Sequence, residues 1–276
     1  MADKSAEDES SQLHGNIWIW VFVTECIVIF IINAFTLIGF ARNPAMRKRT
    51  TYLIINLTVA DLLVGAVTGP LEIKYTYQVE PKQVFSWRKF CILTFGMLFP
   101  VLSLLSLSLI SLERLHASLY PCRHCLIGNW VYFKVIICCW LLAWIFASLV
   151  AVIYSYEPVA NLHVLILASY RVITFLILAV SYIIIIIVKV KKSPSPQYSG
   201  AVASDRKLSV TLSIVTIVSV LTILPRGIHV VIPNSMVNPL IYTVRMREFR
   251  KMLQKVICKT EPLERTCNQP IELHEM

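Results

Sequence analysis

The sequence predicts an all-α fold, a multi-pass bundle of transmembrane helices. The chain of 276 residues is 57% hydrophobic, and its mean hydropathy of +0.68 is far above that of a soluble domain. Several apolar runs reach the roughly 20 residues that a helix needs to cross a bilayer core of about 30 Å. Because these runs are continuous rather than alternating, they exclude a transmembrane β-barrel.

Six apolar segments are long enough to cross a membrane, and a shorter one follows them. The start of the chain is polar and acidic, without the basic and apolar regions of a cleavable signal, so we expect the first helix to direct insertion. A serine- and proline-rich linker is expected between Lys191 and Ala203. The predicted helices cover residues 17–41, 51–75, 91–119, 130–154, 162–190 and 207–229, and the short apolar piece covers 230–244.

The connections alternate in charge, which predicts how the helices are oriented. Basic stretches start at Arg42, Arg123, Lys189 and Arg245, whereas the N-terminus and the 155–161 connection are acidic or neutral. Because basic loops stay on the cytoplasmic side, we expect an extracellular N-terminus in a multi-pass membrane protein. The same bias explains the net charge of +10 more simply than nucleic-acid binding does.

The end of the chain predicts a helix that lies on the inner membrane surface. Apolar residues recur every three or four positions among basic ones, as at Met246, Phe249 and Leu253. Cys258 at its end is a candidate palmitoylation site, with an ordinary thiol as the alternative. The expected regions are an extracellular tail at 1–16, the bundle at 17–244, the membrane-parallel helix at 245–258 and a cytoplasmic tail at 259–276.

Ionisable residues inside the predicted spans are expensive in lipid and therefore mark candidate sites. Asp61 serves either as a structural hydrogen-bonding residue or, as we favour, as a buried cation or proton site. Glu113 and Arg114 form either an interfacial anchor or a local clamp, and their adjacent opposite charges favour the clamp. Arg171 is expected to face the bundle interior or a water-filled cavity, with Glu72 as a candidate partner.

Nothing in the sequence resembles a catalytic motif, so we expect no enzyme activity. The histidines are scattered instead of being set at metal-ligand spacing, and we expect them to be packing or surface residues. The histidines are His116, His124, His163 and His229.

Cys91 is the one cysteine near the predicted outer surface and is expected to be unpaired.

Several residues in a fixed order together resemble a rhodopsin-like, class A G-protein-coupled receptor over about 25–258. Within that family the chain is most similar to the cluster of melanocortin, adenosine, cannabinoid and lysophospholipid receptors. The residues that carry the resemblance are Asn33, Asp61 in "LTVAD", Arg114 in "LER", Trp140, Tyr182, Pro225, the run Asn238-Pro239-Leu240-Ile241-Tyr242, and Phe249.

The resemblance implies an activation switch and an ion site. Arg114 would pair with Glu113 and with Asp205 in the inactive state, and Tyr182 and Tyr242 would surround Arg114 once the lock opens. Asn238 and Pro239 would belong to the same switch. No tightly bound cofactor is expected beyond an allosteric sodium ion, whose oxygen ligands would be Asp61, Ser103, Asn234, Ser235 and Asn238.

The resemblance also has gaps at the ligand end. Gly96 stands where amine receptors carry an aspartate, and Ile232 stands where opsins carry the retinal-binding lysine. Ile223 replaces the tryptophan before the sixth-helix proline, and Cys91 lies about two positions from the expected disulfide cysteine. We assign the candidate ligand pocket to Gly96 and to the two ionisable residues Glu72 and Arg171.

The resemblance implies a deletion between the sixth and seventh helices. From Leu208 to Tyr242 one continuous helix would measure about 52 Å, which is too long for one span of about 30 Å and too short for two spans and a turn. The remnant could form a re-entrant hairpin near Pro233, cross the membrane once, or fail to fold. The predicted architecture is thus a seven-helix receptor with a truncated region between its last two helices.

Two functions follow from these observations. The first is a receptor that transmits an extracellular ligand signal to a heterotrimeric G protein by shifting a conformational population. The alternative is a non-signalling, receptor-derived membrane protein that acts by pairing with a full-length receptor. The expected partners are therefore a G protein, an unidentified extracellular ligand, the lipid bilayer and a second receptor, but no nucleic acid.

Overall fold

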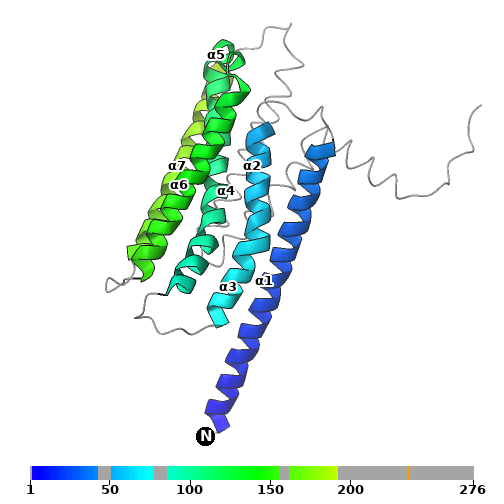
Figure 1. Ribbon diagram of the computed structural model, residues 1–276, viewed down its shortest axis with the longest axis vertical. Coiled ribbons are helices and arrows are strands. Elements are labelled where there is room, and N and C mark those ends of the chain that lie inside the picture. The colour runs from blue at the N-terminus through cyan, green and yellow to red at the C-terminus, as the bar shows by residue number, and fades with distance from the viewer. Residues whose placement is uncertain (1, 43–50, 78–85, 156–161, 192–234, 236–276) are drawn as a thin grey trace, which may run out of the picture.

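The computed structural model describes residues 2–42, 51–77, 86–155, 162–191 and 235. Within these ranges every element is helical, and five helical segments are long and apolar enough to span a membrane. The predicted all-α membrane bundle is therefore confirmed (Figure 1). The elements are α1 (Ala2–Arg42), α2 (Thr51–Leu63), η2 (Val64–Thr68), α3 (Gly69–Tyr77), α4 (Trp87–Leu119), α5 (Pro121–Cys125), α6 (Asn129–Ser155) and α7 (Leu162–Lys191).

The first five predicted spans agree with the membrane-length helical segments to within a few residues. The largest difference is at α4, which begins at Trp87 rather than at 91. Helix α1 extends well beyond its span, back to Ala2, through the region expected to be a tail. The short helix α5 was not predicted. The predicted helices at 207–229 and 245–258, and all of the piece at 230–244 except Ser235, lie outside the described residues.

Helix α4 occupies the centre of the bundle. It contacts α2, η2, α3, α5, α6 and α7, and Figure 1 shows it between the α2–α3 segment and the α6–α7 pair. Its buried side chains include Leu98, Leu102, Leu107 and Ile110, each at most 2% exposed. We call the end of the bundle where α4 meets α5 the α5 end, and the opposite end, where α4 begins, the far end.

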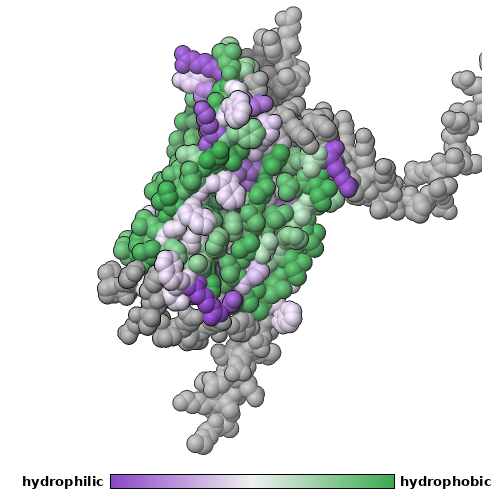
Figure 2. Space-filling view, in the orientation of Figure 1, coloured by the Kyte–Doolittle hydropathy of each residue, from purple (hydrophilic) through white to green (hydrophobic). Residues whose placement is uncertain are grey.

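The outward faces of α6 and α7 are apolar, as expected for helices that contact lipid. Leu141 and Ile145 on α6, and Leu165 and Ile183 on α7, are all more than half exposed. Figure 2 shows that hydrophobic residues cover most of the flank of the bundle, while hydrophilic residues gather near its two ends. This distribution matches a bilayer around the middle of the bundle.

A chain of buried polar groups ties three helices together near the middle of the bundle. Asn56 on α2 donates through Nδ2 to Ser106 Oγ on α4 at 2.8 Å. Trp140 on α6 donates through Nε1 to Asn56 Oδ1 at 2.9 Å. In an apolar interior these groups would be costly without partners, so the link fixes the register of the three helices.

The second span changes from α-helix to π-helix at Val64–Thr68, immediately before Gly69 and Pro70. Proline has no backbone N–H for the preceding turn, which explains why the wider turn forms here. Two glycines let this segment lie directly against α1. A Cβ added at Gly65 would lie 2.7 Å from the Cys26 carbonyl oxygen, and one added at Gly69 would overlap the Cys26 sulfur.

Candidate functional site

A partly open pocket lies between η2, α3, α4 and α7 in the half of the bundle nearer the far end. Gly96 has no atom within 4 Å of where a Cβ would be, so the pocket is unobstructed at this position. The enclosed space is about 40 Å³, enough for a few water molecules. The pocket is lined by Thr68, Glu72, Gly96, Met97, Pro100, Val101, Leu104, Leu167, Tyr170 and Arg171.

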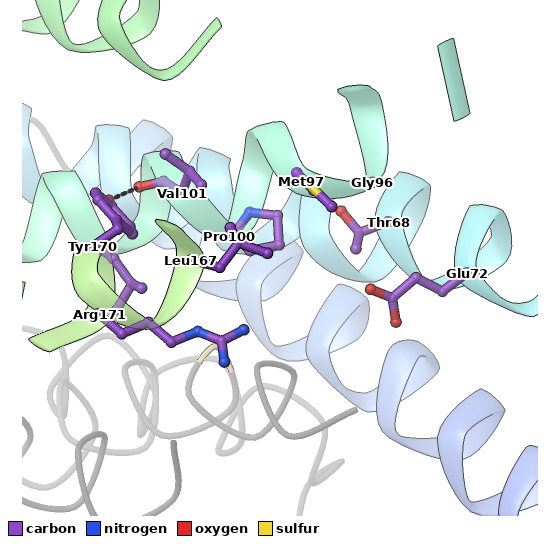
Figure 3. A pocket seen from close by; sticks show the side chains of 10 residues that line it. Thr68, Glu72, Gly96, Met97, Pro100, Val101, Leu167, Tyr170 and Arg171 are labelled. Carbon is purple, nitrogen blue, oxygen red and sulfur yellow. Dashed lines mark hydrogen bonds between the residues drawn. The ribbon is translucent and has the colours of Figure 1, made fainter. Parts of the chain in front are cut away.

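Opposite charges face each other across this pocket. Figure 3 shows the guanidinium of Arg171 on α7 and the carboxylate of Glu72 on α3 directed toward each other from opposite sides of the pocket. Glu72, Gly96 and Arg171 all line this one cavity. That the cavity binds a ligand stays a prediction.

Tyr170 fixes the α7 wall of the pocket. Its hydroxyl donates to the Val101 carbonyl oxygen at 2.8 Å, and its ring packs against Phe146 with ring centroids 4.8 Å apart. On α4, Val101 lies one helical turn after Met97, and both residues line the pocket. Tyr170 thereby holds α7 in register with α4, so that Arg171, its neighbour, stays directed at the pocket.

At the far end, three helices meet around one aromatic ring. Lys89 on α4 is only 6% exposed, and its Nζ lies 5.3 Å from the centre of the Tyr154 ring on α6. His163 on α7 packs edge-on against the same ring, with centroids 4.7 Å apart. Cys91, close by on α4, is exposed and not part of a disulfide. The packing role expected of His163 is thus confirmed.

Asp61 lies in the middle of the bundle and is fully buried. Its Oδ1 accepts a hydrogen bond from Ser103 Oγ at 2.6 Å, so two of the five predicted ion ligands are in contact. Ser235, a third, is buried, and its carbonyl oxygen accepts a bond from Asn33 Nδ2 at 3.1 Å. A buried carboxylate with a neighbouring hydroxyl is chemically suited to a hard cation such as sodium.

The α5 end holds a compact charged cluster. Arg114 Nε lies 3.2 Å from Glu113 Oε2, and both side chains are at most 14% exposed. The other carboxylate oxygen, Oε1, lies 2.8 Å from His124 Nε2 and accepts a longer bond of 3.4 Å from the Tyr132 hydroxyl. Glu113 is therefore shared between its own helix, α5 and α6.

His124 belongs to this charged cluster, and sequence reasoning missed that placement. It was expected to be a packing or surface residue, yet it contacts the carboxylate of the Glu113–Arg114 pair. The signal was hidden because Glu113 and His124 are eleven positions apart and meet only through the turn that α5 makes. Tyr182, predicted to approach Arg114, is buried in the core at this end of the bundle.

The remaining predicted site residues lie outside the described part of the chain. They include the proposed lock partner of Arg114 and the ligands contributed by the seventh helix. The candidate palmitoylation site falls in the same category. These residues are Asp205, Asn234, Asn238, Pro239, Tyr242 and Cys258.

Comparison with known proteins gives one family match. The model of the seven-transmembrane receptor (rhodopsin) family matches residues 32–233, well over half of the chain. No curated protein matches the chain at a significant level. The matched range contains Asp61, Glu113, Arg114 and the pocket, and it ends before Asn238. The chain is thus a membrane-spanning signal-transduction protein that belongs to the rhodopsin family of seven-transmembrane receptors.

Proposed function

We propose that this chain is a plasma-membrane receptor that couples an extracellular ligand to a heterotrimeric G protein. The observation that carries the proposal is that α4 connects two polar sites of different character. The pocket with Gly96 lies along its first half, and the Glu113–Arg114 pair lies near its other end. At 1.5 Å per residue, Gly96 and Arg114 are about 27 Å apart along the helix, close to one bilayer thickness.

The proposed orientation places the N-terminus and the pocket outside and the α5 end inside. The basic residues near the α5 end, such as Arg42 and Arg123, support this orientation. A ligand in the pocket would contact α3, α4 and α7 at once and would favour the conformer in which these helices close around it. In that conformer the inner ends shift and a G-protein α-subunit binds, which is a population shift.

Five finer assignments accompany this proposal. The chain is placed near the melanocortin, adenosine, cannabinoid and lysophospholipid receptors, because its fifth span lacks the proline usual in the family and the outer disulfide partner is missing. Sodium is proposed to bind at Asp61 and Ser103. The deletion before Asn238, the membrane-parallel helix at 245–258 and acylation of Cys258 are likewise proposed.

Nucleotide exchange on purified G-protein α-subunits tests the receptor function. Full-length protein in lipid nanodiscs is expected to accelerate exchange on at least one α-subunit, either basally or with a ligand from a screened panel. Arg114→Ala should abolish the acceleration, because the resemblance implies that Arg114, released from Glu113 and surrounded by Tyr182 and Tyr242, belongs to the active inner face. Lys134→Ala is the matched control, since Lys134 is an exposed cation on α6 near the same end.

The alternative is a non-signalling protein that pairs with a full-length receptor. The short interval between Pro225 and Asn238 favours this reading, because it leaves little chain for the outer part of a ligand pocket. Chain that reaches the cell surface but promotes no exchange on any α-subunit would exclude the receptor function. Co-purification with a full-length relative, together with altered signalling of that relative, would then support the alternative.

A further inference from the structure

Two cysteines on α5 lie one helical turn apart beside the charged cluster. Cys122 and Cys125 are both exposed and reduced, and they are separated by Arg123 and His124 in the sequence "PCRHC". Residues three positions apart on a helix lie on the same side, with Cβ atoms about 5–6 Å apart. A disulfide needs Cβ atoms about 3.5–4.5 Å apart, so a small tightening of the turn would allow the bond.

The backbone that follows the two cysteines is already tighter than an α-helix. Leu126 N–H donates to the Arg123 carbonyl oxygen at 3.1 Å, and Ile127 N–H donates to that of His124 at 3.2 Å. Both bonds span three residues, which is the spacing of a 3₁₀ turn. Inside the Cys122–Cys125 turn, His124 N–H donates to the Tyr120 carbonyl oxygen at 2.9 Å with the four-residue spacing of an α-helix. Contraction would extend the three-residue spacing back into α5 and exchange that bond.

His124 connects this turn to the central helix. It precedes Cys125 directly, and its Nε2 lies 2.8 Å from Glu113 Oε1 on α4. Contraction of the Cys122–Cys125 turn changes the position of the His124 backbone, so the contact with Glu113 cannot persist unchanged. Glu113 would then retain Arg114 as its ionic partner.

We propose that Cys122 and Cys125 form a reversible dithiol–disulfide switch that releases His124 from Glu113. The oxidant is a small cytosolic disulfide such as oxidised glutathione. The thiolate of one cysteine attacks a glutathione sulfur, giving a mixed disulfide and one released glutathione. The second thiolate attacks the protein sulfur of that mixed disulfide and releases the other glutathione.

The reaction balances without a further reagent. The two protein thiols lose two electrons and two protons, and the two glutathione molecules gain both. Because the cytosol keeps most thiols reduced, the disulfide is expected to be transient and regulatory rather than structural. The switch depends on the proposed inner location of α5, but it does not depend on G-protein coupling.

The sequence allows a direct test, because trypsin cleaves after Arg123, between the two cysteines. Membranes with full-length protein are equilibrated with mixtures of reduced and oxidised glutathione, blocked with N-ethylmaleimide and digested without reductant. Mass spectrometry then looks for residues 115–123 and 124–134 as one disulfide-linked pair. The pair is expected to increase with the oxidised fraction and to disappear after dithiothreitol.

Matched variants assign the bond and its effect. Cys122→Ser and Cys125→Ser should each abolish the linked pair, whereas Cys138→Ser, which removes an exposed thiol on α6, should leave it unchanged. Diethyl pyrocarbonate labelling of His124, read on the same peptide, should become several-fold faster in the oxidised protein. This readout needs no G protein, so it separates failure of the switch from failure of the receptor function.

Three results would overturn the proposal. The two peptides could be recovered separately at every redox setting, each alkylated on its cysteine. They could instead carry fatty-acyl groups, which would make α5 an acylation site. Finally, the disulfide could form while the labelling rate of His124 stays the same, which would show that the turn is not coupled to Glu113.

Discussion

Asp61 is an ionisable residue that is fully enclosed in the described core. Its carboxylate is fully buried, and removing a charge from water costs several kcal/mol unless other groups compensate. The hydroxyl of Ser103 donates to it at 2.6 Å, but a neutral donor leaves the charge in place. A proton or a bound cation would remove that charge, and the two produce different responses to salt.

If sodium binds at Asp61, sodium should stabilise the protein more than other monovalent cations do. We expect the midpoint of thermal unfolding to be higher in sodium chloride than in choline chloride at equal ionic strength. Asp61→Asn, which can still accept the bond from Ser103, should remove this difference. Equal midpoints of the wild-type protein in the two salts would instead favour a protonated Asp61.

Single residues also show where sequence reasoning was limited. The contact between Asp61 and Ser103 was expected from the resemblance, because both lie on long helices whose register the sequence determines. The contact between Glu113 and His124 was not expected, because it depends on the path of the chain through α5. Spacing along the sequence carries no information about a contact that a turn creates.

Among the elements, the long helices could be predicted and the irregular ones could not. Membrane-length apolar runs predicted the ends of four spans to within a few residues. These are the span formed by α2, η2 and α3, and the spans formed by α4, α6 and α7. The five-residue helix α5 has too few positions to show a periodicity. The π-turn at Val64–Thr68 depends on Pro70 and on close packing with α1, and hydropathy reports neither.

The contact between η2 and α1 should be sensitive to one added methyl group. Gly65→Ala would place a Cβ 2.7 Å from the backbone oxygen of Cys26, which cannot move away cheaply. We expect a loss of about 1–3 kcal/mol in stability, measured as a lower midpoint of thermal unfolding. Gly96→Ala is the control, because its Cβ would meet nothing within 4 Å and should change the midpoint little.

The far end of the bundle depends on the Tyr154 ring that Lys89 and His163 share. Tyr154→Leu removes the ring beneath a buried ammonium group and should cost about 0.5–2 kcal/mol. Tyr154→Phe keeps the ring and should retain most of the stability. In a double-mutant cycle, Lys89→Met should cost less when combined with Tyr154→Leu than it does in the wild-type protein. Additive losses would mean that the cation and the ring do not interact.

At the scale of the whole molecule, the apolar flank and the charged ends predict how the protein lies in a bilayer. A C-terminal tag after Met276 is expected to bind antibody only after cells are permeabilised, because basic segments remain inside. An N-terminal tag, the control, should be accessible on intact cells. A C-terminal tag exposed on intact surface-positive cells would mean an even number of crossings and would remove Tyr242 from the G-protein side.

The close approach of α1 to the second span has a practical consequence. The sulfur of Cys26 lies where Gly69 leaves room for it, and the side chain is only 6% exposed. Packing of the two helices therefore shields this thiol from reagents. Cys26 is a built-in chemical reporter: its alkylation by a membrane-permeant maleimide, read on the peptide that carries it, would record the fraction of unmodified protein in which the first helix has left the bundle.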